Sequence, residues 1–403
     1  MKITLVCQEV PYPAIHGSRI DMWRRIKAFA DRGVELQIIF WWFGTKPTAE
    51  EIIEISKYAQ KVHSIQIEQT VISRLRRATD LSICPLGTSS RRVKGNELVN
   101  LIDEVRDFDP NFIFLDGIHG GSIATILSQD LNVPIIYRSH NIEHLYVRKL
   151  FTSAIGFKDK IKRYLSVLHV EKYERTILSR SKIFYDISAD DLKFWEGLDF
   201  TNGRLLPPII EFSENLSISD SERSLDRLKS YDIVFLGNLN SENNVEAIIW
   251  FLNEVLPLIH QQLPHITVLI AGCNPVSRIQ PLCEKISGVS LSVNPPSAGD
   301  IYRSGRVLIN PILTGSGVKI KSIDMLTFGK PIVSTREGVS GLPEAVKQYF
   351  KIADSPSDFA QATIEFLSTN INVPIIDRQL LESHFSSEII ENVIADLESL
   401  MHT

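Results

Sequence analysis

The stretch NPILTGSGVKIKSIDMLTFGKPIVST, residues 310–335, has the pattern of a strand end, a glycine turn, a helix and a second strand. Gly315 and Gly317 carry no side chain, so the backbone N–H groups of the turn can approach a ligand closely. Apolar residues then recur at roughly helical spacing, and Gly329 with Pro331 ends the helix; they are Ile320, Ile323, Leu326 and Phe328. The pattern predicts a β-α-β unit.

Lys319 and Lys321 fall at the start of this predicted helix. A helix N-terminus carries unpaired N–H groups, and nearby lysines add positive charge, so the segment suits a phosphorylated ligand. A glycine turn alone is more typical of a plain β-α-β unit that binds nothing. The function therefore has to be argued from further segments.

The chain has 403 residues, 44% of them hydrophobic and 23% charged, with a formal net charge of −5. One hydrophobic core stops growing near ~250–300 residues, so two domains are expected. The acidic total argues against broad nucleic-acid binding. The four cysteines lack metal-type or redox spacing, so we expect reduced thiols. No apolar run reaches ~18 residues, and the one at the start is too short for a secretion signal, so the cytoplasm is expected.

Strand-like and helix-like runs alternate through the chain, which predicts parallel α/β sheets. In the first half we expect strands at residues 3–7, 35–42, 62–67, 112–116, 134–139 and 182–187, and helices at 18–32, 95–107, 118–129 and 161–178. The polar stretch 211–230 is a predicted linker. Strands are expected again at 232–237, 267–271, 289–293, 307–310, 332–334 and 350–352. Two such domains place ligands outside the carboxyl ends of their strands, which predicts a site in a cleft between them.

Two further segments could carry chemistry. The loop from Pro11 to Arg19 follows the first strand and could place backbone amides and Arg19 beside a diphosphate, or could simply connect strand to helix. His140 ends the predicted strand at 134–139, where it could hydrogen-bond a substrate hydroxyl or only loop backbone. The run His140–His144 also fits H-x-x-E-H, a zinc-peptidase motif that needs both histidines on one helix face. Here the run follows directly on a predicted strand, which is not the context of a zinc peptidase. Asp107 and Asp109 could also bind a cation, but they lie before a strand, at the wrong end for a cleft site. We therefore assign no metal.

Two basic clusters stand out against the acidic total. They comprise Arg74, Arg76, Arg77, Arg91, Arg92 and Lys94, and Arg148, Lys149, Lys158, Lys160, Lys162 and Arg163. The second is interleaved with apolar residues such as Phe151 and Phe157. Basic helices with apolar neighbours can rest on an anionic bilayer, whereas a solvated helix face is the simpler interpretation. Peripheral contact with the inner face of a membrane is therefore one of two interpretations.

With these segments in view, the chain resembles the retaining glycosyltransferases of family 4, often called group 1, which have the GT-B fold. The resemblance extends from Ile3 to about Phe385 and is best over residues 314–333. Family members have there a glycine loop, an acidic residue in the following helix, and Gly-x-Pro. Three further stretches agree in order: 11–19, 139–143 and 235–240, the last followed by Asn244.

The resemblance implies two Rossmann-like domains facing across a cleft. Residues 1–211 would form the acceptor-side domain, 212–380 the nucleotide-sugar side, and 381–403 a helix that packs back on the N-terminal domain. The implied reaction moves a hexose from a UDP- or GDP-linked donor to a glycan, lipid-linked or protein acceptor. It proceeds with retention and without metal or other cofactor, as in polysaccharide biosynthesis.

The resemblance also implies site residues. His140 would contact the donor sugar near the reacting carbon, and Lys321, or else Lys319, would neutralise the diphosphate. Asp324 would bind the ribose hydroxyls, where most members have glutamate, and Ser316 stands where many members have a glutamate. The remaining donor-binding residues would be Gly17, Ser18, Arg19, Gly237, Asn238, Gly315, Gly317 and Val318. Asp324 and Ser316 thus differ from the usual residues of the family, which leaves a catalytically silent GT-B subunit as one alternative. A GT-B sugar-nucleotide epimerase is the other.

Overall fold

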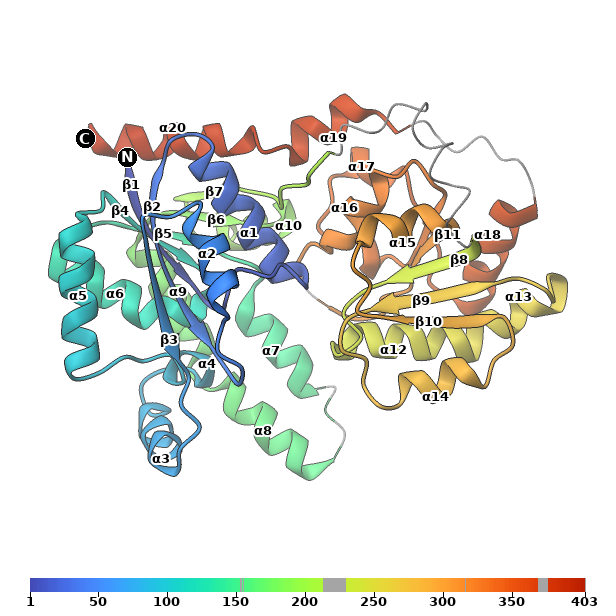
Figure 1. The fold of residues 1–403 in the computed structure, drawn as a ribbon, viewed down its shortest axis with the longest axis horizontal. Coiled ribbons are helices and arrows are strands. Elements are labelled where there is room, and N and C mark those ends of the chain that lie inside the picture. The colour runs from blue at the N-terminus through green and yellow to red at the C-terminus, as the bar shows by residue number, and fades with distance from the viewer. Residues whose placement is uncertain (153, 155, 213–229, 316, 369–375, 403) are drawn as a thin grey trace. The chain divides into compact units, whose positions relative to one another are not determined.

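The computed structural model describes residues 1–403 except 153, 155, 213–229, 316, 369–375 and 403. The chain forms two compact units, which we treat separately. The N-terminal unit comprises residues 1–14, 18–209 and 387–403, and the C-terminal unit comprises 15–17 and 210–386. Figure 1 shows a parallel sheet with helices around it in each unit.

The N-terminal unit is built on seven parallel strands in the order β3-β2-β1-β4-β5-β6-β7. The central strands β1, β2, β4 and β5 are mainly apolar because helices cover both faces of such a sheet. The strands are β1 Lys2–Cys7, β2 Glu35–Trp42, β3 Lys61–Gln66, β4 Phe112–Asp116, β5 Ile135–Arg138, β6 Ser181–Asp186 and β7 Gly203–Leu205. The helices are α1 Gly17–Ala30, α2 Ala49–Ser56, α3 Val71–Asp80, α4 Leu86–Ser89, α5 Asn96–Phe108, α6 Gly121–Leu131, α7 Glu143–Thr152, α8 Phe157–Val167, α9 Val170–Arg180, α10 Ala189–Glu196 and α20 Ile389–Met401.

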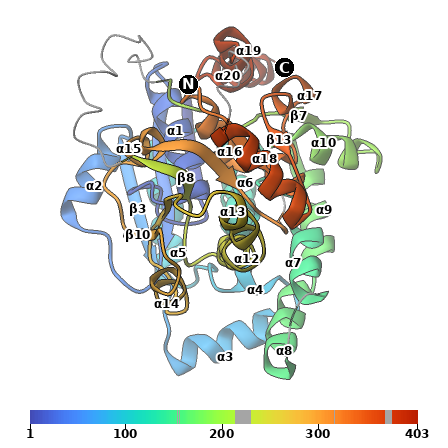
Figure 2. The same cartoon turned by 90° about the vertical axis from the view of Figure 1, so that its right-hand side faces the viewer.

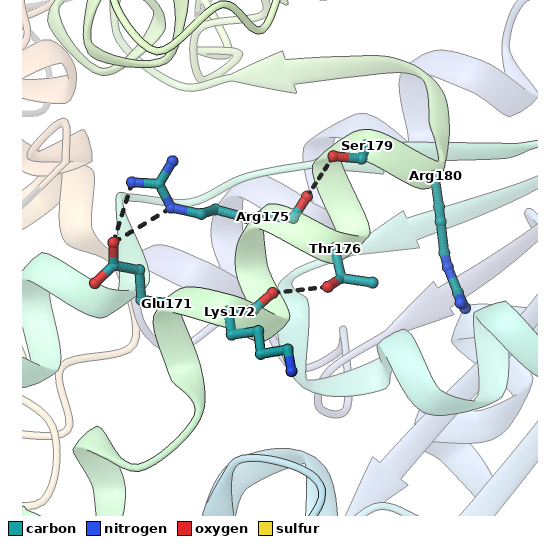
Figure 3. Close-up of a pocket in the computed structure, with 6 residues that line it drawn as sticks. All are labelled: Glu171, Lys172, Arg175, Thr176, Ser179 and Arg180. Carbon is teal, nitrogen blue, oxygen red and sulfur yellow. Dashed lines mark hydrogen bonds and ion pairs between the residues drawn. The ribbon is translucent and has the colours of Figure 1, made fainter.

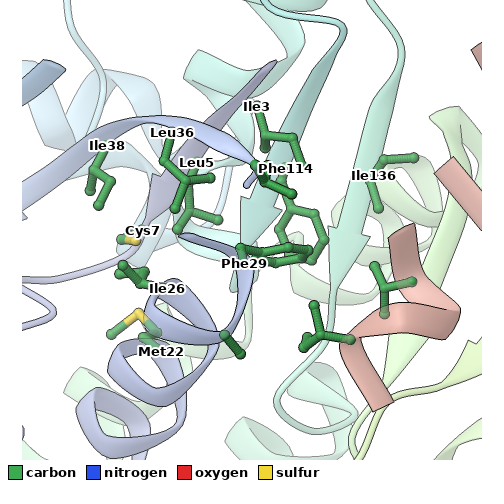
Figure 4. Packing of buried hydrophobic residues seen from close by; sticks show 14 of the residues in the cluster. Ile3, Leu5, Cys7, Met22, Ile26, Phe29, Leu36, Ile38, Phe114 and Ile136 are labelled. Carbon is green, nitrogen blue, oxygen red and sulfur yellow. The ribbon is translucent and has the colours of Figure 1, made fainter. Parts of the chain in front are cut away.

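Helix α1 packs on this sheet through one apolar face (Figure 4). The Phe29 ring meets the Phe114 ring of β4 edge-on, with centroids 5.6 Å apart. Ile390, Val393 and Leu397 of α20 belong to the same buried cluster, so the end of the chain completes the core of the N-terminal unit.

The C-terminal unit repeats the topology with six parallel strands in the order β10-β9-β8-β11-β12-β13. The strands are β8 Tyr231–Leu236, β9 Val268–Gly272, β10 Val289–Val293, β11 Gly305–Asn310, β12 Ile332–Ser334 and β13 Lys351–Ile352. The helices are α12 Glu242–Trp250, α13 Leu256–Gln262, α14 Ile279–Glu284, α15 Ala298–Ser304, α16 Ile320–Leu326, α17 Glu344–Lys347, α18 Pro356–Ser368 and α19 Arg378–Phe385. The predicted class, two Rossmann-like α/β domains, is confirmed.

Three local predictions were wrong. The helix expected over 161–178 is two helices, because Leu168 is extended and His169 adopts a left-handed conformation at φ 63°. Neither glycine nor proline marks that break. Strand β7 was missed because it has only three residues. Phe328 lies outside α16, which ends at Leu326 with Thr327 as its C-cap. Among the described residues, no helix is long and apolar enough to cross a membrane.

Candidate functional site

The strand order locates the expected ligand crevice of the C-terminal unit. Strand β8 pairs with β9 on one side and with β11 on the other. From β8 the chain adds strands toward one edge of the sheet, and from β11 it adds them toward the other edge, so the strand order reverses between β8 and β11. Doubly wound sheets bind ligands outside the carboxyl ends of strands at such a switch point. The loops that leave β8 and β11 there contain Gly237, Asn238 and residues 311–319, the segments that the sequence singled out.

Asn244 connects these two loops. Its side-chain amide donates to the Asn238 carbonyl oxygen at 2.9 Å, and its Oδ1 accepts from the Lys321 ammonium at 2.7 Å. The Thr314 hydroxyl approaches Asn243 Oδ1 at 3.5 Å. The structure therefore brings Asn238 and Lys321 to one place within the C-terminal unit.

The glycine loop after β11 is a tight backbone turn. Gly317 has φ 62°, a left-handed conformation that glycine adopts without strain. A Cβ atom at Gly315 would lie 2.9 Å from Lys319 Cε, so the Lys319 side chain would have to shift to admit one. Val318 is buried, whereas Ser316 lies outside the described residues. Lys319 is the N-cap of the seven-residue α16 rather than part of its first turn.

The two lysines of this segment have different surroundings. The Lys319 ammonium donates to the Gly317 carbonyl oxygen at 2.9 Å, to Glu337 Oε1 at 3.1 Å and to Ser340 Oγ at 3.1 Å. Within the part of the chain that the structure describes, no carboxylate pairs with Lys321. Its ammonium lies 4.4 Å from the centre of the Phe235 ring. A bound anion can thus gain more from Lys321 than from Lys319.

Burial, followed by the nearby charge of Lys319, lowers the pKa of Lys321 well below its usual value. Both effects disfavour the ammonium form in the empty protein. An anion at the loop would reverse this shift, because opposite charge favours the protonated lysine. The electrostatics of the C-terminal unit are therefore suited to an anionic ligand.

Polar contacts beneath the loop fix α16 in place. The buried Asn310 amide donates to Ser322 Oγ at 2.7 Å, and the Ser322 hydroxyl donates to the Gly338 carbonyl oxygen at 2.6 Å. A Cβ atom at Gly338 would fall 2.2 Å from Ser334 Oγ, so only glycine fits. Asp324 is half-buried on α16, one turn after Lys321.

The predicted residues of the first loop fall in different surroundings. Gly17 groups with the C-terminal unit, where a Cβ atom would lie 3.7 Å from Ile320 Cδ1. Ser18 belongs to the N-terminal unit and accepts from the Gln8 amide at 3.3 Å. Arg19 pairs with Glu9 at 3.1 Å, so its guanidinium already has a carboxylate partner.

His140 follows β5 at the carboxyl edge of the N-terminal sheet, as predicted. Its Nε2 lies 2.5 Å from Asp116 Oδ1 at the end of the neighbouring strand β4. The other Asp116 oxygen accepts from Arg25, which also pairs with Asp21 at 2.9 Å. Burial would raise the pKa of Asp116, but Arg25 and His140 outweigh it and hold the pKa well below its ordinary value. Asp116 is therefore a carboxylate that accepts a hydrogen bond from the N–H at His140 Nε2.

Glu143 and His119 lie near His140 at the same edge. His119 Nε2 is 3.8 Å from Glu143 Oε1, and the Glu143 side chain is 15% exposed. Burial and the nearby Glu174 raise the pKa of Glu143 to about 7. Burial, then Arg91 and His140, lower the pKa of His119. At neutral pH His119 is therefore uncharged and Glu143 is close to half protonated, and both side chains can hydrogen-bond hydroxyl groups.

The two histidines of the H-x-x-E-H run have different partners. His144 Nδ1 binds the buried Glu174 at 2.6 Å, and the His144 ring packs against Phe194 and Trp195, with ring centroids 5.9 and 5.7 Å away. His140 instead binds Asp116. Over the described residues there is no group of three or more His, Cys, Asp or Glu that could hold a metal ion.

A hollow on the surface of the N-terminal unit lies along α9 (Figure 3). Polar side chains line it: Glu171, Lys172, Arg175, Thr176, Ser179 and Arg180. Arg175 is tied to Glu171 at 3.0 Å on the same helix. None of the residues predicted to bind donor lies in this hollow.

Sequence reasoning missed several residues of these clusters. Asn244 was noted only as part of a pattern, and Glu337 and Arg25 were given no role. Glu337 follows strand β12 at its carboxyl edge. The strand rule that located His140 could have found it.

The model of a known family matches part of the chain. Residues 230–369 match the family described as glycosyl transferases group 1. That range holds β8, the glycine loop, α16 and Glu337. An uncharacterized 44.6 kDa protein in the cps region of Klebsiella pneumoniae is 26% identical over 381 residues, which is 92% of each chain.

Solved structures with the same fold cover nearly the whole chain. HepE of Anabaena, in complex with UDP and glucose, superimposes with a TM-score of 0.63 at 11% identity, covering 99% of each chain. Sucrose-phosphate synthase of Thermosynechococcus elongatus gives 0.69 at 13% identity, covering 100% of this chain and 99% of that one. A TarM variant of S. aureus, in complex with fondaparinux, alpha-GlcNAc-glycerol and UDP, gives 0.67 at 11% identity, covering 98% and 99%.

Proposed function

We propose that this chain, which has the GT-B fold and matches the group 1 glycosyltransferase model over residues 230–369, is a glycosyltransferase of that type. It transfers a hexose from a nucleotide-diphosphate sugar with retention and without a metal ion. One observation carries the proposal. Lys321 lies beside the glycine loop, at the switch point of the C-terminal unit, and no carboxylate among the described residues pairs with it.

The diphosphate of the donor is the anion that fits this place. Lys321 neutralises it, the backbone of Gly315 and of residues 317–319 supplies N–H donors, and Gly237 with Asn238 lies beside it. Lys319, held by Glu337, keeps the loop in shape and adds positive charge. Asp324 contacts the ribose hydroxyls, and Ser316 belongs to the same loop. The complexes of HepE and TarM with UDP support a uridine nucleotide as the first choice, with GDP as the alternative.

The chemistry follows from the charges that develop in the reaction. Cleavage of the anomeric C–O bond builds negative charge on the departing diphosphate and positive charge on the sugar. Lys321 stabilises the first where it develops, which lowers the barrier rather than only the ground state. The diphosphate can leave without a metal ion in this scheme, because the lysine and the amides supply the positive potential.

His140 acts on the sugar in this proposal. In this proposal His140 donates from Nε2 to the Asp116 carboxylate, so Nδ1 is the ring nitrogen that is left to accept a hydrogen bond. A sugar hydroxyl near the reacting carbon is the group it would accept from. Gly17, Ser18 and Arg19 belong to the same proposal as donor contacts, Arg19 through a guanidinium that Glu9 orients.

The acceptor is a glycan or a lipid-linked or protein acceptor, bound by the N-terminal unit. The relative from the cps region supports a role in polysaccharide biosynthesis. We propose that this transfer takes place in the cytoplasm, at the inner face of a membrane. We assign His119 and Glu143 to an acceptor hydroxyl, because both can hydrogen-bond it.

A thermal-stability screen against UDP, GDP, ADP and their common sugars tests the proposal. Ligand at about 100 times its dissociation constant should stabilise the protein by ~2.7 kcal/mol. A catalytically silent subunit that lacks the donor site would show no such gain with any nucleotide. An epimerase would convert the donor without an acceptor, which product analysis of the donor alone detects.

A further inference from the structure

Two helices of the N-terminal unit expose unusually apolar surfaces. Large hydrophobic side chains on α3 and α8 are between 47% and 80% exposed: Val71, Ile72, Leu75, Phe157, Ile161 and Tyr164. Phe157, Ile161 and Tyr164 are spaced by four and three residues, so they lie along one face of α8. On α3, Val71 and Leu75 share a face and Ile72 adjoins it. We call these six residues the α3–α8 face.

Basic residues surround these apolar side chains. Helix α8 contains four basic residues and one acid in the run KDKIKR, and α3 contains three arginines and one acid, whereas the whole chain is acidic. Lys160 and Lys162 are exposed, and no described carboxylate pairs with either. Exposed Arg76 on α3 likewise has no described carboxylate partner. Apolar side chains flanked by unpaired cations complement an apolar layer edged with negative charge.

The topology places both helices at one edge of the sheet. Helix α3 follows β3, and α8 follows β5 through α7, so both come after the carboxyl ends of parallel strands. The short helix α4 contacts both of them. Figures 1 and 2 show α3 and α8 at the same end of the N-terminal unit in two perpendicular views. Strand β4 ends with Asp116 at this same edge, and β5 leads to His140 there.

From this arrangement we infer that the α3–α8 face binds the surface of an anionic lipid bilayer. Phe157, Ile161 and Leu75 enter the interface between headgroups and acyl chains, while Lys160 and Lys162 extend to anionic headgroups. The function of such binding rests on the proposed transfer to a lipid-linked acceptor, which the bilayer would present at the carboxyl edge near His140. The binding itself needs no nucleotide, so it can be tested apart from the proposed function.

Flotation of the full chain with vesicles tests the inference. We expect binding to phosphatidylcholine vesicles that contain about 30% phosphatidylglycerol, weaker binding to phosphatidylcholine alone, and release as salt rises to about 0.5 M. Leu75→Ser with Phe157→Ser should lower the vesicle partition coefficient at least roughly tenfold. Lys160→Glu with Lys162→Glu should lower it by a similar factor on anionic vesicles only.

Matched controls lie outside the α3–α8 face. Val99 on α5 and Val293 on β10 are comparably exposed, so Val99→Ser with Val293→Ser should leave binding unchanged. Lys182→Glu with Lys285→Glu removes the same charge from other exposed sites and should lower binding far less. Stabilisation by UDP, measured on each preparation, should be the same for all variants.

Three outcomes would overturn the inference. The first is no binding of the unmodified chain to anionic vesicles, and the second is equal loss in the control variants. The third is a dimer in sedimentation velocity that Leu75→Ser with Phe157→Ser dissociates, which would make the face an interface between copies. Vesicle binding without any response to nucleotide would retain the inference and count against the proposed function.

Discussion

His140 Nε2 and Asp116 Oδ1 lie 2.5 Å apart, at the ends of the adjacent parallel strands β5 and β4. Asp116 is in turn held by Arg25, so the imidazole is oriented by a carboxylate that cannot rotate freely. Because the ionised Asp116 can only accept a hydrogen bond, Nε2 is the donor of this contact, and Nδ1 is the ring nitrogen left for the proposed sugar contact.

Asp116→Asn should lower kcat about 10²-fold or more, with little change in the donor KM, because it disturbs the tautomer and orientation of His140. His140→Gln should cause a similar loss. If Asp116 acts through His140, the double variant should lose little beyond either single one, since residues that act as a unit are not additive. Multiplicative losses, with thermal stability preserved, would assign Asp116 a role independent of His140.

Arg25→Met should lower the free energy of unfolding by ~3–5 kcal/mol, because it leaves Asp21 and Asp116 buried without their guanidinium. The control is Arg32→Met, whose partner Glu391 is exposed and whose loss should cost at most about 1 kcal/mol. Urea unfolding at neutral pH measures both. The pKa values of Asp21 and Asp116 are lowered by folding, so their contribution is full above the unfolded pKa near ~4 and is lost in acid. Equal effects of the two substitutions would contradict this account of the network.

Glu143 should make the protein less stable as pH rises. Its pKa of about 7 in the folded state lies above the value of the unfolded chain, so folding takes up a proton between those values. Stability should fall from about pH 4.5 to pH 7 by up to ~3 kcal/mol from this group. Glu143→Gln should match the unmodified chain near pH 4.5 and exceed it at about pH 8. A constant difference across the range, in urea unfolding followed at several pH values, would rule out the raised pKa.

The sequence predicts the two parallel sheets well because most of the central strands are short, mainly apolar runs between turn residues. Strands β2 and β4 were located to the residue, since burial on both faces leaves few polar positions inside them. The break at His169 could not be predicted, because a left-handed histidine carries no local signal and depends on how α8 and α9 pack.

For the candidate site, the sequence located residues on loops but not their partners. Lys321 and Lys319 look equivalent in the sequence, two positions apart. The fold separates them, because Glu337 reaches Lys319 from the end of β12 while Asn244 reaches Lys321 from α12. Pairings across 18 and 77 residues depend on strand order. The Asp116–His140 contact is of the same kind.

Calorimetric titration of UDP into the unmodified chain, Lys321→Met and the control Lys285→Met tests the central claim most directly. The account predicts that Lys321→Met weakens binding roughly 10- to 100-fold, the worth of a charged hydrogen bond, with the fold retained. Lys285 is exposed on the surface, and its substitution should change nothing. In the unmodified chain, UDP binding should weaken as pH rises above the lowered pKa of Lys321, because the bound diphosphate favours the protonated lysine. Over the same pH range, UDP binding should take up a proton. Equal UDP affinity in Lys321→Met and the control would contradict the claim that Lys321 binds the diphosphate.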